Sequence, residues 1–366
     1  MSGVELPFND LSPGEDDADV RAAIDRVLRR GWFVLGPELE AFEAEFAAAA
    51  GARFAVGVGN GTDAIALLLR AGGIGPGDEV IVPAMTAAFT ALGVMAAGAL
   101  PVIVDVDPET LMLDVETCEA SLTSRVTALL PVHLYGQPAD MAGLRRLAER
   151  RHLLLIEDCC QAHLATYRGQ PVGTFGVGGA FSFYPTKNLA ALGDAGAVVT
   201  ADATLADRVR RLRNGGQSER YKHDESGVNS RLDDLQAAVL RTRLARLPEW
   251  TARRRTLGGL YRKRLDGVID MPPEREPGHV YHLFPVRSPR RDRLQQHLRD
   301  AGIGTLVHYP KPLSEQPAFA ACRRDACTNA AAAARELLSL PLHPRLIDAD
   351  VERVAGEVQR FAQESD

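Results

Sequence analysis

Cysteine is scarce in this sequence, with five residues among 366. Their odd number and irregular spacing are untypical of a disulfide framework and fit no zinc-binding pattern, so we expect no metal site. A reducing cytoplasm is the expected setting for such a chain. The five are Cys118, Cys159, Cys160, Cys322 and Cys327.

Strong positive charge and secretory features are also lacking. The formal net charge is −6, so no general attraction to nucleic acid or anionic membranes is expected. The polar, acidic N-terminal stretch lacks the basic and apolar blocks of a secretory signal. The stretch from Val80 to Val104 contains no charged residue and is long enough to span a bilayer. However, prolines and glycines interrupt it. We predict a buried strand, helix and strand there instead of a membrane span.

Apolar, strand-like runs alternate with helical stretches through the first two thirds of the chain. This alternation predicts a largely parallel sheet with helices on both faces. The unbroken apolar run from Leu153 to Ile156 is typical of a central strand. Three prolines at 272, 273 and 277 follow a long predicted helix. We therefore predict a large domain over residues 1–248 and a smaller α/β domain over 249–366. The predicted strands cover 53–58, 78–83, 101–106, 126–134, 152–158, 181–184, 196–200 and 282–287.

Asp158 and Lys187 are the residues that point to chemistry. Asp158 ends a predicted strand, where open α/β sheets place their ligand crevice, and Lys187 follows another short strand. Pyridoxal phosphate requires both groups: a lysine to form an imine and move protons, and a carboxylate to keep the pyridine nitrogen protonated. Either residue alone is better explained by a salt bridge, so the assignment depends on the features that accompany the pair.

A phosphate cradle is one such feature. A glycine-rich turn leads into a predicted helix at Gly61 and Thr62, whose backbone N–H groups would suit a phosphate dianion. Ser182, on the strand before Lys187, would reach the same group. The alternative for Thr62 is an ordinary helix N-cap. A dinucleotide site fits poorly. Its motif requires an acidic residue at the end of a strand about 20 positions after the glycines, whereas the acidic residues at that distance here come before a strand.

Longer motifs extend over nearly the whole chain: GTDAIALLL, PGDEVIVPA, LLPVHLYGQPADM, IEDCCQAH, FSFYPTKN, GDAGAVVT and GVNSRLDDLQAAVL. In this order and spacing the sequence resembles the DegT/DnrJ/EryC1/StrS sugar aminotransferases. The resemblance implies an α/β protein of the aspartate-aminotransferase-like fold type I, with pyridoxal phosphate at the interface of a homodimer.

The resemblance also implies roles for individual residues. Lys187 would form the imine with the cofactor, Asp158 would hold the pyridine nitrogen, and Gln161 would hydrogen-bond the phenolic oxygen. The phosphate would be bound by Gly61, Thr62 and Ser182, together with Asn229 of the neighbouring subunit.

The implied substrate is a nucleotide-linked keto-deoxysugar, with glutamate as amino donor. The motifs YHLF and HYP resemble enzymes that aminate C3 of dTDP-3-keto-6-deoxyhexoses. Amination at C4 is the alternative, because Ser314 occupies a position often held by histidine in the C3 subclass. Tyr184, His308 and Tyr309 are the candidates for hexose contacts, and each equally fits a packed side chain.

One departure from the family pattern concerns cofactor stacking. Ala87 stands where an aromatic residue is usual, and Phe89 lies two positions further on. Two other functions fit the sequence less well. A pyridoxal-dependent sugar dehydratase is disfavoured by Lys187, because those relatives carry histidine there. A non-catalytic sensor or regulatory protein is disfavoured by the intact set of Asp158, Gln161 and Lys187.

Overall fold

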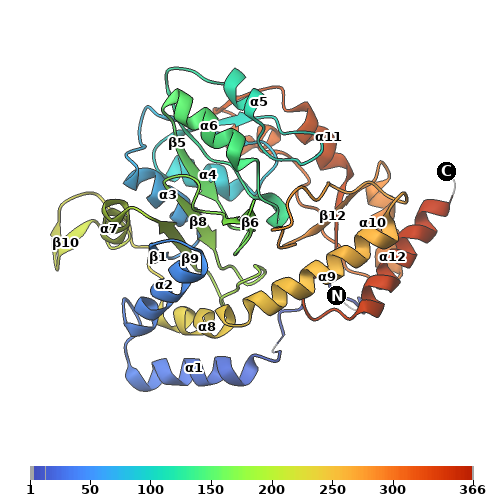
Figure 1. Cartoon of the computed structure of the whole chain (residues 1–366), viewed down its shortest axis with the longest axis horizontal. Coiled ribbons are helices and arrows are strands. Elements are labelled where there is room, and N and C mark those ends of the chain that lie inside the picture. Colours follow the sequence, from blue (N-terminus) through green and yellow to red (C-terminus); the bar gives the residue numbers. More distant parts are fainter. Residues whose placement is uncertain (1–3, 13, 365–366) are drawn as a thin grey trace.

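An eight-stranded sheet forms the centre of the molecule in the computed structural model, which describes residues 4–12 and 14–364 (Figure 1). Only β9 runs antiparallel to its neighbours in this sheet, so the predicted largely parallel arrangement is confirmed. The strands, in spatial order, are β1 (Phe54–Val58), β9 (Gly196–Thr200), β8 (Gly178–Ser182), β5 (Leu154–Asp158), β4 (Val126–Leu129), β2 (Glu79–Pro83), β3 (Leu100–Val104) and β13 (Arg323–Arg324).

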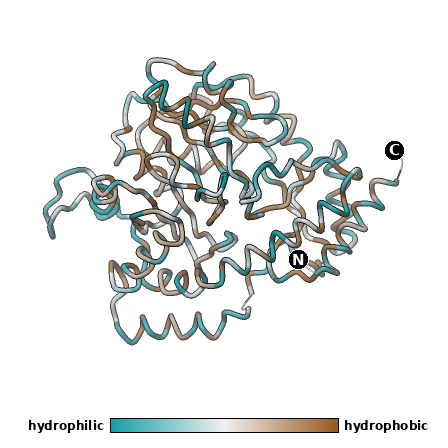
Figure 2. Tube along the Cα trace, viewed as in Figure 1, coloured by the Kyte–Doolittle hydropathy of each residue, from teal (hydrophilic) through white to brown (hydrophobic). Residues whose placement is uncertain are grey.

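Helices cover both faces of the sheet (Figure 1). The first part of the chain contains α1 (Asp17–Arg30), α2 (Pro37–Ala49), α3 (Gly61–Ala71), α4 (Ala88–Ala96), α5 (Val115–Ala120), α6 (Met141–Arg151), α7 (Ala203–Leu212) and α8 (Asp234–Leu244). The remainder contains α9 (Leu247–Leu265), α10 (Arg291–Asp300), α11 (Thr328–Glu336) and α12 (Asp348–Gln363). The short strands β10 (Gln217–Glu219) and β11 (Lys222–His223) form a projecting, largely hydrophilic hairpin (Figure 2).

The charge-free stretch from Val80 to Val104 folds as the sequence predicts. Most of β2, α4 and β3 is buried in the main hydrophobic core. Among the described residues, no helix combines the length and the apolar character needed to cross a membrane.

Three predicted strands end earlier than expected, and the one predicted over 101–106 stops at Val104. The strand predicted over 126–134 stops at Leu129, because Pro131 has no N–H to continue a ladder. The segment still contacts β5, since the N–H of Asp158 donates to Pro131 O and the N–H of His133 donates to Asp158 O. The strand predicted over 181–184 is instead β8, which ends at Ser182 before the chain turns at Pro185.

The C-terminal part has a hydrophobic core of its own. Buried residues of α9, α10 and α12 pack there with β12 (Phe284–Arg287) and β14 (Leu337–Leu340), and Leu6 joins them from the N-terminal segment. However, β13 pairs with β3, and α11 packs against the core of the large sheet. The division at residue 248 therefore stays a prediction.

Candidate active site

Asp158 lies at the carboxyl end of β5, and its carboxylate is buried. Its Oδ2 accepts a hydrogen bond from Thr90 Oγ over 2.8 Å, and its Oδ1 accepts from the backbone N–H of Cys160 over 3.1 Å. Thr90 Oγ also lies 2.9 Å from Thr86 Oγ. A hydroxyl has one proton, so Thr90 donates to the carboxylate and accepts from Thr86. This chain of hydroxyls fixes the orientation of the carboxylate.

Lys187 comes from the neighbouring strand, as the spacing predicts. β5 and β8 are parallel, with Asp158 opposite Ala180, and the chain turns after β8 so that Lys187 N–H donates to Tyr184 O over 2.8 Å. Burial lowers the pKa of the Lys187 amine, and the negative charge of Asp158 partly offsets this shift. A lowered pKa increases the fraction of free amine, the form that attacks a carbonyl carbon.

Gly61 begins α3 beside Ser182. A Cβ placed on Gly61 would lie 2.7 Å from the Ser182 Cβ and 2.9 Å from the Cys160 Sγ, so only glycine permits this close approach. The helix is capped by the Asn60 side chain, which accepts from the N–H of Asp63. The N-cap role considered for Thr62 is therefore wrong. The N–H groups of Gly61 and Thr62 have no partner within the helix, which leaves them available for an anion.

Gln161 is held between two tyrosines. Its Oε1 accepts from the N–H of Tyr135 over 2.6 Å, and its Nε2 donates to Tyr309 Oη over 2.8 Å. The Tyr135 hydroxyl donates to His308 O over 2.5 Å, which places the HYP segment over the carboxyl edge of the sheet. His308 itself stacks on Phe8, and its Nδ1 lies 2.9 Å from Ser339 Oγ. Tyr309 is thus linked directly to a predicted cofactor residue, whereas His308 is linked through its backbone.

Tyr184 and Asn229 are exposed in the single chain. Asn229 forms an isolated bridge with Asn214, and Ser230 beside it accepts from Gly59 N–H and donates to Asp63. The roles of both residues toward substrate or a partner subunit's cofactor stay predictions. The same holds for the other site residues, although their arrangement brings them together.

Ala87 immediately precedes α4, and Phe89 lies in its first turn with 64% of its surface exposed. Thr90, the next residue, points to Asp158. Phe89 therefore lies about 100° around the helix from the residue that faces the carboxylate. Phe89 therefore does not take the place of the aromatic ring that the family resemblance implies at position 87.

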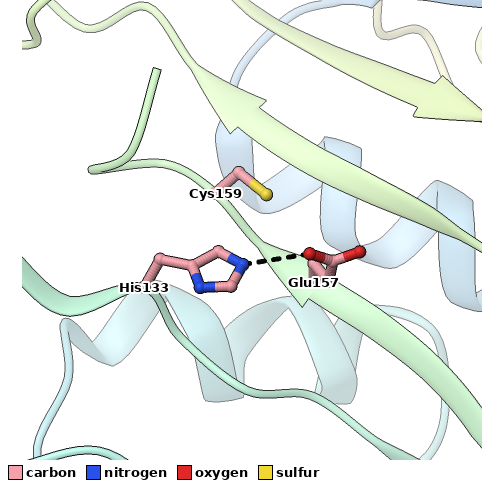
Figure 3. A group of neighbouring side chains, drawn as sticks. All are labelled: His133, Glu157 and Cys159. Atoms are coloured by element: carbon pink, nitrogen blue, oxygen red, sulfur yellow. Dashed lines mark hydrogen bonds and ion pairs between the residues drawn. The ribbon is translucent and has the colours of Figure 1, made fainter. Parts of the chain in front are cut away.

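A buried cluster of His133, Glu157 and Cys159 lies at the end of β5 (Figure 3). Glu157 precedes Asp158 in this strand, so its side chain points to the opposite face of the sheet. Glu157 accepts from the N–H groups of Gly173 and Phe175, both over 2.7 Å, and lies 3.1 Å from His133 Nε2. The N–H of Ala139 donates to His133 Nδ1, which places the imidazole proton on Nε2, facing Glu157. These atoms are used in hydrogen bonds that hold the end of β5 in place.

The arrangement fits pyridoxal phosphate on three counts. The oriented carboxylate of Asp158 suits a pyridinium nitrogen, the amine of Lys187 suits the aldehyde carbon, and the cradle at Gly61 suits the phosphate. When bound, the cofactor withdraws electrons from the carbon that carries the transferred amino group. Sequence reasoning missed Thr90. Its signal was a hydroxyl in a charge-free apolar helix, because such a buried group requires a hydrogen-bond partner.

Comparison with known proteins agrees with this geometry. A sequence profile of the DegT/DnrJ/EryC1/StrS aminotransferase family matches residues 15–359. The chain is 49% identical to dTDP-3-amino-3,4,6-trideoxy-alpha-D-glucose transaminase of Streptomyces venezuelae, over 99% of this chain and 97% of the relative. It is 48% identical to the erythromycin biosynthesis sensory transduction protein EryC1 of Saccharopolyspora erythraea, over 94% and 96%.

Solved structures show the same fold. DesV of S. venezuelae superposes with a TM-score of 0.95 at 49% identity and covers 99% of both chains. NtdA of Bacillus subtilis, with bound PMP, gives a TM-score of 0.92 at 31% identity, over 100% of this chain and 86% of the other. The fold is therefore that of the aspartate-aminotransferase-like fold type I, as predicted. The chain belongs to the DegT/DnrJ/EryC1/StrS family of pyridoxal-phosphate-dependent aminotransferases.

Proposed function

We propose that this enzyme transfers an amino group to a dTDP-linked keto-6-deoxyhexose, at C3 of the sugar. The observation that carries the proposal is a buried, oriented carboxylate at the end of β5 together with a lysine of lowered pKa in the loop that follows the adjacent parallel strand β8. The sugar class is supported by relatives at 49% and 43% identity whose names describe dTDP-3-amino sugars.

The chain's own residues have distinct tasks in this reaction. Asp158 orients the pyridine ring and stabilises its positive charge. Lys187 would hold the aldehyde carbon of the cofactor and would move a proton to and from the carbon that carries the amino group. Tyr309 and Gln161 form one wall beside these groups.

A homodimer with shared sites is part of the proposal. Several large apolar side chains are exposed in the single chain near the start of α2 and around the Lys187 loop, a pattern typical of a subunit interface. They include Trp32, Phe33, Val34, Tyr184 and Leu192. Asn229, exposed beside Ser230, would then reach the phosphate of the partner's cofactor.

Glutamate is the proposed amino donor, and an absorbance experiment tests donor and acceptor together. Glutamate should convert the visible band of the purified holoenzyme to that of the pyridoxamine form, and a dTDP-3-keto-6-deoxyhexose should restore it. A dTDP-4-keto-6-deoxyhexose should restore it more slowly. Faster recovery with the 4-keto sugar would move the reaction to C4.

A regulatory function is the second candidate, because two relatives have names that describe sensory transduction and pleiotropic regulation. The lowered pKa of Lys187 and the threonine hydroxyl groups that orient Asp158 favour a catalytic function over a regulatory one. A protein that stays colourless with added pyridoxal phosphate would favour regulation instead, and would indicate that Ala87 marks a lost cofactor site.

A further inference from the structure

A cavity of about 300 Å³ lies beside the loop that carries Lys187. Residues 185–188 form one wall, and the N-terminal segment 9–12 forms another. Arg254 and Trp250 of α9 and His343 complete it. Lys187 is part of this wall, whereas Asp158, Gln161 and Gly61 do not line the cavity, so it adjoins the predicted cofactor site only at the Lys187 loop.

Arg254 is an unusual cation in this wall. Only 6% of its surface is exposed, and it forms no ion pair with any described residue. Its hydrogen bonds all come from Nη1, which donates to the carbonyl oxygens of Leu342 over 2.7 Å and Tyr281 over 3.2 Å, with His282 O at 3.5 Å. Burial lowers the pKa of Arg254 to about 10, and no carboxylate opposes the shift.

The opposite edge of the same guanidinium is free. Nε has no hydrogen-bond partner, and Nη2 forms no hydrogen bond with the described chain. Nε and Nη2 form the edge through which arginine binds a carboxylate with two parallel hydrogen bonds. His343, with 8% of its surface exposed, also lacks a hydrogen bond of ordinary geometry at either ring nitrogen.

The acidic residues of the cavity are already partnered. Asp16 pairs with Arg243 over 2.7 Å, Asp10 pairs with Arg345 over 3.0 Å, and Glu15 accepts from the Trp250 indole N–H over 2.7 Å. A buried cation without a counter-ion is costly, so an anion in this cavity would stabilise the fold.

We propose that this cavity binds the carboxylate of a small molecule, held by the Nε–Nη2 edge of Arg254 and by the His343 ring. The ligand is either the amino donor or a carboxylate that does not react. Binding of a carboxylate here does not depend on the proposed sugar substrate.

Trp250 provides a direct readout, because it lines the cavity and the chain has only two tryptophans. In the holoenzyme with Trp32→Phe, titration with sodium glutarate should change the Trp250 fluorescence to saturation, whereas sodium chloride at equal ionic strength should not. Glutarate has no amino group, so its binding is measured independently of transamination.

Variants test the assignment to Arg254. Arg254→Lys keeps the charge but loses the planar edge, and should weaken glutarate binding at least about tenfold. The matched control, Arg243→Lys, alters a cavity arginine that already has a carboxylate partner, and should change binding less than about twofold. An absent saturable change, or equal binding by Arg254→Lys, would overturn the proposal.

His343→Phe covers the case in which Arg254→Lys does not fold, because it leaves the carbonyl bonds of Arg254 intact. It should also weaken glutarate binding, and unchanged binding would overturn the proposal. The two ligand sources are distinguished by kinetics with glutamate. If Arg254→Lys raises the KM for glutamate by the factor lost in glutarate binding, the ligand is the amino donor. If the KM stays unchanged while glutarate binding falls, it is a separate carboxylate.

Discussion

The hydroxyl of Thr90 donates a hydrogen bond to the carboxylate of Asp158 over 2.8 Å, and both side chains are buried. Thr90 belongs to α4 and Asp158 to β5, so the contact joins segments 68 residues apart in the sequence. It fixes the carboxylate that we propose to hold the pyridine nitrogen of the cofactor, although Thr90 is not one of the residues to which the family resemblance assigned a role.

Thr90→Val should therefore lower kcat by about tenfold, because it removes one hydrogen bond to a charged group. Thr86→Val is the control, since it removes the hydroxyl one step further from the carboxylate and should have a smaller effect. Turnover and the visible absorbance of the bound cofactor give the two measurements. Equal losses in both variants would show that packing of α4, and not the bond to Asp158, is what matters.

Lys187→Ala should abolish transamination while leaving the fold intact, because it removes both the covalent attachment and the proton shuttle. Single-turnover spectra with glutamate measure the loss, and circular dichroism checks the fold. Substantial turnover by this variant would contradict the assignment of Lys187.

Glu157→Gln should destabilise the protein by about 2 kcal/mol or more, because an amide N–H₂ would face backbone N–H groups that now donate to the carboxylate. Urea unfolding measures this change. The control is Glu149→Gln, which alters an exposed ion pair with Arg145 and should leave the free energy of unfolding nearly unchanged. A chelator should not alter the unfolding curve of the wild type. A stabilising effect of added zinc would instead reveal a metal site at His133, Glu157 and Cys159.

The buried side chain of His163 should make the free energy of unfolding fall as the pH is lowered. Burial lowers its pKa to about 3 from the ordinary value of 6.5. Between these values the unfolded state takes up a proton that the native state does not, so stability falls as the pH falls. His163→Phe should cost about 1 kcal/mol at neutral pH, through loss of the contact with Ser182 O. It should also lose less stability than the wild type between pH 6.5 and 3. Parallel unfolding curves across this range would contradict the prediction.

Mixed dimers test the shared site. Asn229→Ala and Lys187→Ala should each give a weakened or inactive enzyme on its own. In a mixed dimer, the subunit that retains Lys187 receives Asn229 from its partner, so one complete site forms. Activity should therefore rise when the two variants are dissociated and reassociated together. A mixture no more active than the separate proteins would place Asn229 outside the partner's site.

The sequence by itself determined the fold class and the neighbouring positions of Asp158 and Lys187 at the carboxyl edge of the sheet. Apolar runs that alternate with helical segments allow few topologies, because parallel strands need crossovers of a dozen or more residues. The strand order then brings Asp158 beside β8, so the pair could be predicted from spacing. The early ends of β4 and β8 were missed because the apolar pattern continues past the last ladder bond.

Only the tertiary structure decided which neighbours complete the site. Thr90 at Asp158, Tyr309 at Gln161 and Asn60 as the cap of α3 depend on contacts between side chains on separate elements, or on a backbone angle at one turn. The free edge of Arg254 is of the same kind. The sequence identifies an arginine but does not say which of its five N–H groups have hydrogen-bond partners. The positions of the backbone carbonyl groups in the folded chain decide this.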